Sequence, residues 1–117
     1  MITIVEDDAA IRESLKLLLE TRGYDVDVFS SGDELLANLD FAQCACMIFD
    51  VNLPGQNGFE VVAKLRKQGV TTPVIFMSGR ANAAMRVQAQ SAKAVGFFDK
   101  PVRPADLLAT VAKVAAG

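Results

Sequence analysis

The sequence predicts an α/β fold in which a parallel β-sheet is covered by helices on both faces. Short apolar runs alternate with amphipathic stretches along all 117 residues, without an internal repeat or a low-complexity linker. Most of these apolar runs are nearly continuous, which is typical of parallel strands that are buried on both faces. We therefore expect a single domain over residues 1–117.

The expected strands are short and regularly spaced. They cover residues 2–5, 25–29, 46–49, 73–77 and 95–98. The run 25–29 alternates acidic and apolar residues, so it is expected to be an edge strand. Five β/α repeats with right-handed crossovers favour the strand order 2-1-3-4-5, the doubly wound topology of flavodoxin-like (βα)5 folds.

Helices are expected after each strand. The first is indicated by Ile11, Leu15, Leu18 and Leu19 at helical spacing, with Gly23 at its end. The others are indicated by a capping box at 31–34 before Leu35, Leu36 and Leu39, by Val61, Val62 and Leu65, by the stretch 81–90, and by Pro104 before Leu107, Leu108, Val111 and Val114.

The stretch 81–90 differs from the other expected helices. Its only larger apolar side chains are Met85 and Val87, which we expect to anchor it to the sheet. With so few anchors, it should be the least firmly packed helix and a candidate for movement.

The charge and the apolar runs narrow the possible functions. Lys and Arg number 12 against 14 Asp and Glu, a net charge of -2 that does not suggest a surface for coating nucleic acid. The apolar runs stop well short of the roughly 18 residues that a membrane span needs. Acidic residues follow Met1 within a few positions, where a secretion signal would be basic. We expect a cytoplasmic protein that does not itself bind nucleic acid or membrane.

Histidine and cysteine content excludes several kinds of chemistry. The chain has no histidine, so Ser/His and Cys/His catalysis and a phosphohistidine carrier role are excluded. Cys44 and Cys46 are too close on an extended segment to bridge readily, and they lack distant partners for a zinc site. We expect two free thiols at the start of a buried strand.

Polar side chains stand at the carboxyl ends of four expected strands. They are Glu6-Asp7-Asp8, then Asp50, then Ser78-Gly79, then Lys100-Pro101. Each alone has a simple structural explanation, as a helix cap, a turn or a solvated side chain. Their joint placement does not, because the carboxyl ends of parallel strands form the usual ligand-binding crevice of such sheets.

The residue types suit transfer of a phosphoryl group to a carboxylate. Glu6, Asp7 and Asp50 would bring three negative charges together, with Lys100 as the nearby cation. A divalent cation is then needed before another anion can approach, and oxygen-rich sites favour Mg²⁺ or Mn²⁺. The metal and Lys100 would neutralise the phosphoryl oxygens while Asp50 acts as nucleophile.

Four segments carry a family resemblance. Residues 4–8, 49–54 with Gly58 after them, 77–79 and 97–101 resemble the signature blocks of response-regulator receiver domains of bacterial two-component systems, the CheY-like superfamily. The resemblance runs from residue 2 to about 114. It implies a signalling switch rather than an enzyme, in which Asp50 takes a phosphoryl group from a sensor histidine kinase or a histidine phosphotransfer protein.

The resemblance also implies roles for the other site residues. Asp7 would bind the metal directly, Glu6 through water, Asp50 by its carboxylate and Asn52 by its backbone carbonyl. Ser78 would be the switch hydroxyl that bonds the phosphoryl group, Lys100 would pair with that group, and Phe97 would be the aromatic switch. The Lys100-Pro101 bond resembles one that is cis in the family.

The resemblance implies that phosphorylation shifts the population between two conformations of the face formed by the fourth helix, the fifth strand and the fifth helix. This face could also form a phosphorylation-dependent dimer. The region from Ser78 to Pro101 resembles receivers that precede LuxR-type DNA-binding domains. An output domain of that kind would lie outside this chain.

The chain departs from the family pattern at two positions. Lys93 stands where the family often has a glycine after the fourth helix, so a left-handed cap there would be strained or replaced. Ser78 lacks the methyl group that restricts the side-chain rotamer of threonine. Its absence would loosen the coupling between Ser78 and Phe97. Arg80, two residues past Ser78, is expected to influence the rate of dephosphorylation by steering water or anions.

Three other functions are compatible with parts of the pattern. A haloacid-dehalogenase-like phosphatase also uses a strand-terminal aspartate, but it normally has a second aspartate where this chain has Asn52. A flavodoxin-like FMN module would need a phosphate-binding loop after the first strand, which is absent here. A phosphorylation-independent interaction module would not require the complete acidic set.

Overall fold

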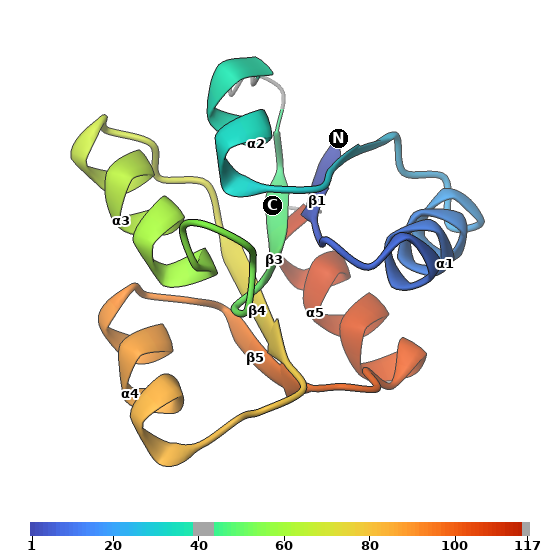
Figure 1. The fold of residues 1–117 in the computed structure, drawn as a ribbon. Coiled ribbons are helices and arrows are strands. Elements are labelled where there is room, and N and C mark those ends of the chain that lie inside the picture. Colours follow the sequence, from blue (N-terminus) through green and yellow to red (C-terminus); the bar gives the residue numbers. More distant parts are fainter. Residues whose placement is uncertain (39–43, 116–117) are drawn as a thin grey trace.

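A parallel sheet forms the centre of the molecule (Figure 1), which we describe from a computed structural model over residues 1–38 and 44–115. The strand order is β2-β1-β3-β4-β5, which confirms the predicted topology. The strands are β1 (Ile2–Val5), β2 (Val26–Phe29), β3 (Cys46–Asp50), β4 (Val74–Ser78) and β5 (Gly96–Asp99). The helices are α1 (Ala9–Glu20), α2 (Gly32–Asn38), α3 (Gly58–Lys67), α4 (Ala83–Ser91) and α5 (Pro104–Ala115).

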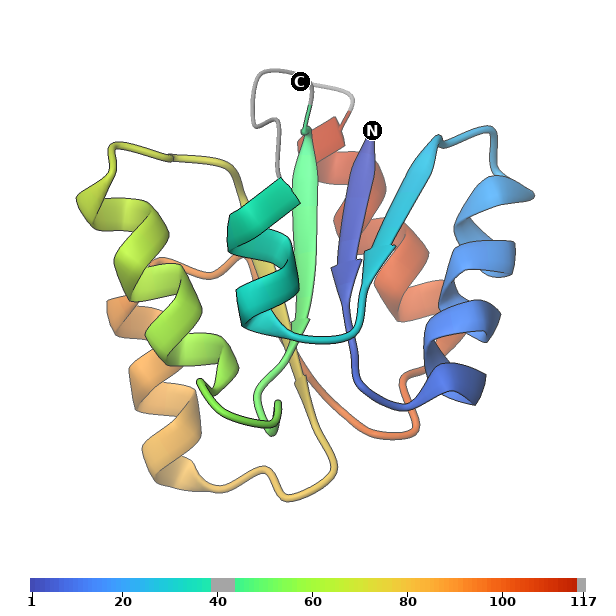
Figure 2. The ribbon, with the colours of Figure 1, turned by 45° about the horizontal axis from the view of Figure 1, so that its top comes forward.

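Helices cover both faces of the sheet (Figure 2). One apolar cluster joins α2, α3 and α4 to alternate strand residues such as Phe49 and Phe76. The other joins α1 and α5 to the opposite side, represented by Ile48 and Ile75. Consecutive strand residues thus enter different clusters, because side chains alternate across a strand.

None of the helices in the described residues is long and apolar enough to cross a membrane.

The two edge strands are less buried than the central three. β2 lies at one edge, as its alternating pattern predicted, and Asp27 is exposed there. β5 lies at the other edge, so both of its phenylalanines are only half-buried. Phe98 looks like a core residue from the sequence, but it is only partly buried, because among residues 1–38 and 44–115 no strand pairs with the outer side of β5. Phe97 and Phe98 pack against opposite clusters.

Helix ends follow the capping residues. Asp8 accepts a hydrogen bond from the backbone N–H of Ile11 at 3.0 Å and begins α1, while Gly23 takes a φ of +87° just after its end. Ser31 Oγ accepts from the N–H of Glu34 at 3.1 Å, which is one bond of the predicted capping box before α2. The expected anchor Leu39 lies outside the described residues.

The fourth helix is weakly anchored, as predicted, but only one of the two residues named for it is an anchor. It begins after Asn82, whose side chain accepts from the N–H of Met85, and Ala89 is its one buried residue. Met85 packs against the core, whereas Val87 is 60% exposed and is not an anchor. After the helix, Lys93 takes a φ of +58°, so of the two expected outcomes the left-handed cap is kept, on a non-glycine residue, rather than replaced.

Candidate functional site

The predicted site residues meet at the carboxyl edge of the sheet. Asp50 is the last residue of β3 and Ser78 the last residue of β4, while Glu6 and Lys100 directly follow β1 and β5. Glu6 and Ser78 are fully buried and Asp50 is 2% exposed. The polar groups expected at the carboxyl edge therefore meet there, in a region that we call the acidic crevice, and most of them are withdrawn from water.

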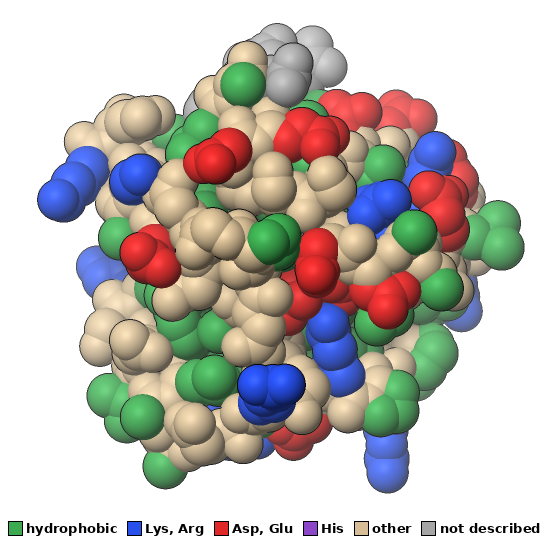
Figure 3. Space-filling model, viewed as in Figure 1, with side chains coloured by type: hydrophobic (Ala, Val, Ile, Leu, Met, Phe, Trp, Pro, Cys, Tyr) green, Lys and Arg blue, Asp and Glu red, His purple; other side chains and the backbone are tan. Residues whose placement is uncertain are grey.

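Three carboxylates lie together in this crevice. One oxygen from each of Glu6, Asp7 and Asp50 lies within 4.8 Å of the other two, and Asp7 is the exposed member. Figure 3 shows acidic and basic side chains against one another near the middle of this face. An all-oxygen donor set of this kind fits a hard cation such as Mg²⁺, which keeps several waters in its shell.

Lys100 neutralises part of this negative charge. Its Nζ lies 2.6 Å from Glu6 Oε1 and 3.1 Å from Asp50 Oδ2. The peptide bond from Lys100 to Pro101 is cis, as expected. The ammonium therefore bridges a carboxylate after β1 and the carboxylate that ends β3, two strands that are neighbours in the sheet.

These contacts shift the proton affinities of the site. The pKa of Glu6 is raised to about 7, chiefly because the group is buried; the bond to Lys100 opposes this rise and the nearby Asp50 adds to it. Burial opposes the charge on Lys100, but its bonds to Glu6 and Asp50 outweigh that effect and raise its pKa. Lys100 thus stays protonated at neutral pH, while Glu6 titrates there.

The turn after β3 fixes the Asp50 carboxylate. The backbone N–H of Asn52 donates to Asp50 Oδ1 at 3.1 Å, and the N–H of Gly58 donates to the carbonyl of Val51 at 2.9 Å. A Cβ atom at position 58 would lie 2.7 Å from the carbonyl oxygen of Asp50, so the first turn of α3 can approach β3 this closely only with glycine there.

Ser78 lies at the centre of a hydrogen-bond network. Its Oγ accepts from Asn52 Nδ2 at 3.0 Å and from the backbone N–H of Arg80 at 3.0 Å. The hydroxyl also contacts Met85 Sδ on α4 at 3.7 Å. The roles of the Asn52 amide and of Met85 were not anticipated, because they depend on side-chain directions that residue spacing does not reveal.

Phe97 lies where α4 meets β5. The guanidinium carbon of Arg86 lies 5.0 Å from the centre of its ring, and Arg86 also pairs with Asp99 Oδ2 at 3.1 Å. This half-exposed contact from α4 covers the aromatic ring. Arg80 is exposed, and its backbone N–H is bonded to Ser78 Oγ, so this residue lies next to the site and is accessible from solvent.

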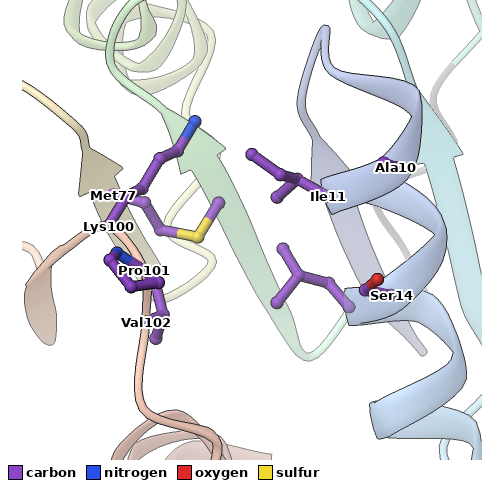
Figure 4. A pocket seen from close by; sticks show the side chains of 8 residues that line it. Ala10, Ile11, Ser14, Met77, Lys100, Pro101 and Val102 are labelled. Carbon is purple, nitrogen blue, oxygen red and sulfur yellow. The ribbon is translucent and has the colours of Figure 1, made fainter.

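A groove of about 480 Å³ lies between α1 and the segment after β5, and Lys100 is part of its lining. In Figure 4, Ile11 on α1 faces Met77 and Lys100 across it. Its lining is mostly apolar, with Pro101 and Val102 forming one wall. Lys100 therefore borders both the groove and the acidic crevice.

Two further contacts support the acidic turn after β1, one from Asp8 and one from Arg12, a residue that sequence reasoning missed. The N–H of Asp8 donates to Glu6 Oε2 at 3.3 Å, and Arg12 Nη1 donates to the carbonyl of Glu6 at 2.9 Å. Arg12 is one helical turn inside α1 and carries no sequence signal for this contact. Both bonds hold the turn that presents Glu6 and Asp7.

Comparisons with known proteins identify the relatives of this chain. The family model described as response regulator receiver domain matches residues 2–112. The response regulator protein TodT of Pseudomonas putida is 38% identical over 111 residues, covering 95% of this chain and 49% of TodT. The transcriptional regulatory protein FixJ of Bradyrhizobium diazoefficiens is 32% identical over 110 residues, covering 94% of this chain and 54% of FixJ. This chain spans about half the length of these relatives.

A solved structure agrees with both the fold and the family. The response regulator receiver domain protein (CheY-like) from Methanospirillum hungatei superposes with a TM-score of 0.89 at 33% sequence identity. The match covers 98% of this chain and 92% of that chain. The likeness therefore extends over the whole sheet and all of its covering helices.

Proposed function

Because the chain belongs to the response regulator receiver domain family, we propose that Asp50 is its phosphoryl acceptor. Receiver domains of response regulators are phospho-accepting signalling switches rather than enzymes. The observation that carries the proposal is the setting of the Asp50 carboxylate, with Oδ1 bonded to the N–H of Asn52 and Oδ2 paired with Lys100. This setting directs a nearly buried nucleophile toward the crevice.

In the proposed reaction, an Asp50 oxygen attacks the phosphorus of a phosphohistidine. The P–O bond to Asp50 forms as the P–N bond breaks, and the imidazole nitrogen leaves with the electron pair of that bond. The donor would be a sensor histidine kinase or a histidine phosphotransfer protein. Lys100 would then bind a phosphoryl oxygen, since its Nζ already lies 3.1 Å from Asp50 Oδ2.

A Mg²⁺ or Mn²⁺ ion fits the three clustered carboxylates. Asp7 and Asp50 would hold the ion directly, Glu6 through water and Asn52 by its backbone carbonyl. When bound, the metal supplies positive charge that offsets the negative charge of the carboxylates and the incoming phosphoryl group. The exposed position of Asp7 supports this role, because it leaves one side of the cluster open to solvent and to the donor.

The switch would begin at Ser78, which would donate to the phosphoryl group. Charge-assisted hydrogen bonds from Ser78 and Lys100 are worth roughly 1.5 to 3 kcal/mol each. Moving a population from 1:99 to 99:1 takes about 5.5 kcal/mol, a comparable amount. The shift would reach α4, β5 and α5, with Phe97 turning inward and with this face available for a phosphorylation-dependent dimer.

The relatives suggest what the switch controls. TodT is a response regulator and FixJ a transcriptional regulatory protein, and each is about twice as long as this chain. We therefore propose that phosphorylation of Asp50 controls a DNA-binding output domain outside these 117 residues, and so transcription in the cytoplasm.

The phosphatase alternative lacks its acid group. A phosphatase of that type needs a proton donor two residues after the nucleophile, whereas the amide of Asn52 is bonded to Ser78. Family membership also supports a switch rather than an enzyme. A phosphorylation-independent interaction module would not require the three clustered carboxylates or their pairing with Lys100.

The experiment is incubation with acetyl phosphate, with and without Mg²⁺, followed by intact-mass measurement. We expect the wild type to gain the mass of one phosphoryl group only with Mg²⁺, and Asp50→Asn to gain none. A wild type that gains no phosphoryl mass, or a variant that gains as much, would show that the proposal is wrong.

A further inference from the structure

We propose that Met85 on α4 holds the hydroxyl proton of Ser78 while Asp50 is unphosphorylated, and that this contact couples α4 to the phosphorylation site. The inference rests on the function proposed above and assigns a positioning role to Met85. The contact between Met85 and Ser78 would link the switch hydroxyl to α4, the helix that is expected to move.

The hydrogen bonds around Ser78 determine where its hydroxyl proton can be donated. Ser78 is fully buried, and its Oγ receives N–H groups from Asn52 and Arg80. Both of these partners are donors, so the single hydroxyl proton must be given elsewhere. Within residues 1–38 and 44–115, the only acceptor recorded for it is Met85 Sδ, at 3.7 Å.

A phosphoryl group on Asp50 would compete for this proton. A thioether sulfur is a weak acceptor, whereas a charged phosphoryl oxygen is a strong one. Because the hydroxyl has only one proton, bonding the phosphoryl group requires it to leave Met85. No covalent bond changes in this step; the O–H group only exchanges one acceptor for another.

Losing this contact matters because α4 buries so few side chains against the sheet. Met85 lies in its first turn, where its N–H is bonded to the side chain of Asn82 at 2.9 Å. Ala89, one turn later, is the only buried residue of the helix, and Val87 is 60% exposed. Met85 is therefore a main attachment of the start of α4 to the sheet, and its release would free this end of the helix first.

The exchange makes a quantitative prediction for Met85→Leu. Leucine keeps the apolar volume but cannot accept the proton, so the unphosphorylated state alone loses a hydrogen bond. With Mg²⁺ and beryllium trifluoride as the phosphoryl analogue, calorimetry should give roughly 2- to 5-fold tighter binding of the analogue, corresponding to a weak hydrogen bond. In the Ser78→Ala background the same substitution should change binding little, which closes a double-mutant cycle.

Met47→Leu is the matched control. Met47 is a fully buried methionine on β3 in the same apolar cluster, but it is paired with Val74, at the opposite end of β4 from Ser78. Its substitution should leave the affinity for beryllium trifluoride unchanged. If it tightens binding as Met85→Leu does, the effect is one of general packing and the inference is wrong.

A second readout follows the methionine methyl groups by NMR. Without the analogue, Ser78→Ala should shift the Met85 methyl resonance and leave that of Met47 in place. The inference is overturned if Met85→Leu binds the analogue like the wild type, or if it tightens binding equally without the Ser78 hydroxyl. Failure of the wild type to bind the analogue would instead overturn the proposed function, and this inference with it.

Discussion

The side-chain amide of Asn52 donates to the hydroxyl oxygen of Ser78 over 3.0 Å, although the two residues lie 26 positions apart. The backbone N–H of Asn52 also donates to Asp50. One residue therefore touches both the proposed phosphoryl acceptor and the proposed switch hydroxyl. This bridge holds the ends of β3 and β4 in a defined arrangement before any phosphoryl group is bound.

Asn52→Ala should destabilise the unphosphorylated protein. The exposed amide gives a buried oxygen one of its two N–H donors, so we expect the free energy of unfolding to fall by about 0.5 to 1.5 kcal/mol. Urea denaturation measures this change. In the Ser78→Ala background the effect should nearly vanish; an undiminished loss would mean that Asn52 acts through other contacts.

Gly58→Ala should disturb the acceptor itself. The added Cβ would lie 2.7 Å from the Asp50 carbonyl oxygen and 3.2 Å from Val51 Cα, so α3 must shift away from β3. We expect a loss of roughly 1 to 3 kcal/mol in urea denaturation, together with slower phosphorylation by acetyl phosphate.

Gly79→Ala provides the comparison for this change. A Cβ at position 79 would meet only Lys100 Cδ, at 3.9 Å, which is an ordinary contact. Its stability should stay within about 0.5 kcal/mol of the wild type. Equal losses from both substitutions would count against a specific role for the close approach of α3.

Glu6 should make the stability of the metal-free protein depend on pH. Its pKa is raised from 4.5 to about 7 on folding, so the folded state binds the proton more tightly than the unfolded chain. The stabilisation from this group is present below pH 4.5 and is lost as the pH rises through 7. Between pH 5 and pH 8, the free energy of unfolding of the wild type should fall relative to Glu6→Gln by on the order of 2 kcal/mol.

Mg²⁺ should reverse part of this loss. A bound cation favours the charged carboxylate and lowers its pKa, so saturating Mg²⁺ at pH 8 should stabilise the wild type more than Glu6→Gln. Urea denaturation at the two pH values, with and without Mg²⁺, tests both parts. An identical response of the two proteins to pH would contradict the burial of an ionisable Glu6.

Arg80→Ala should change the lifetime of the phosphorylated protein. The side chain is exposed at the rim of the site, where its charge can steer water or anions toward the phosphoryl group. The decay of phosphorylated protein, followed by intact mass after acetyl phosphate is removed, measures this lifetime. An unchanged lifetime would leave Arg80 without a modulating role.

The sheet and the positions of the main site residues could be predicted from the sequence. Asp50, Ser78 and Lys100 each follow or end an apolar run, and parallel strands bring such ends to one edge. A left-handed residue at Lys93 was one of two outcomes expected from the resemblance, because the family often has glycine at this position. These features depend on periodicity and chain order, which a sequence displays directly.

The contacts of α4 could not be predicted in the same way. Which side of a helix faces the sheet depends on where the helix begins, and Asn82 begins it so that Met85 reaches Ser78 while Val87 points to solvent. The partial exposure of Phe98 likewise depends on β5 being an edge strand. Side-chain direction and lateral covering are three-dimensional facts that spacing alone leaves open.

The identity of the phosphorylated residue tests the account most directly. After incubation with acetyl phosphate and Mg²⁺, borohydride reduces an aspartyl phosphate to homoserine, and fragmentation of the resulting peptides locates it. We predict homoserine at position 50 and at no other aspartate. Homoserine at another position such as Asp7 or Asp8, or none at all despite a gain in phosphoryl mass, would contradict the assignment of Asp50 as the acceptor.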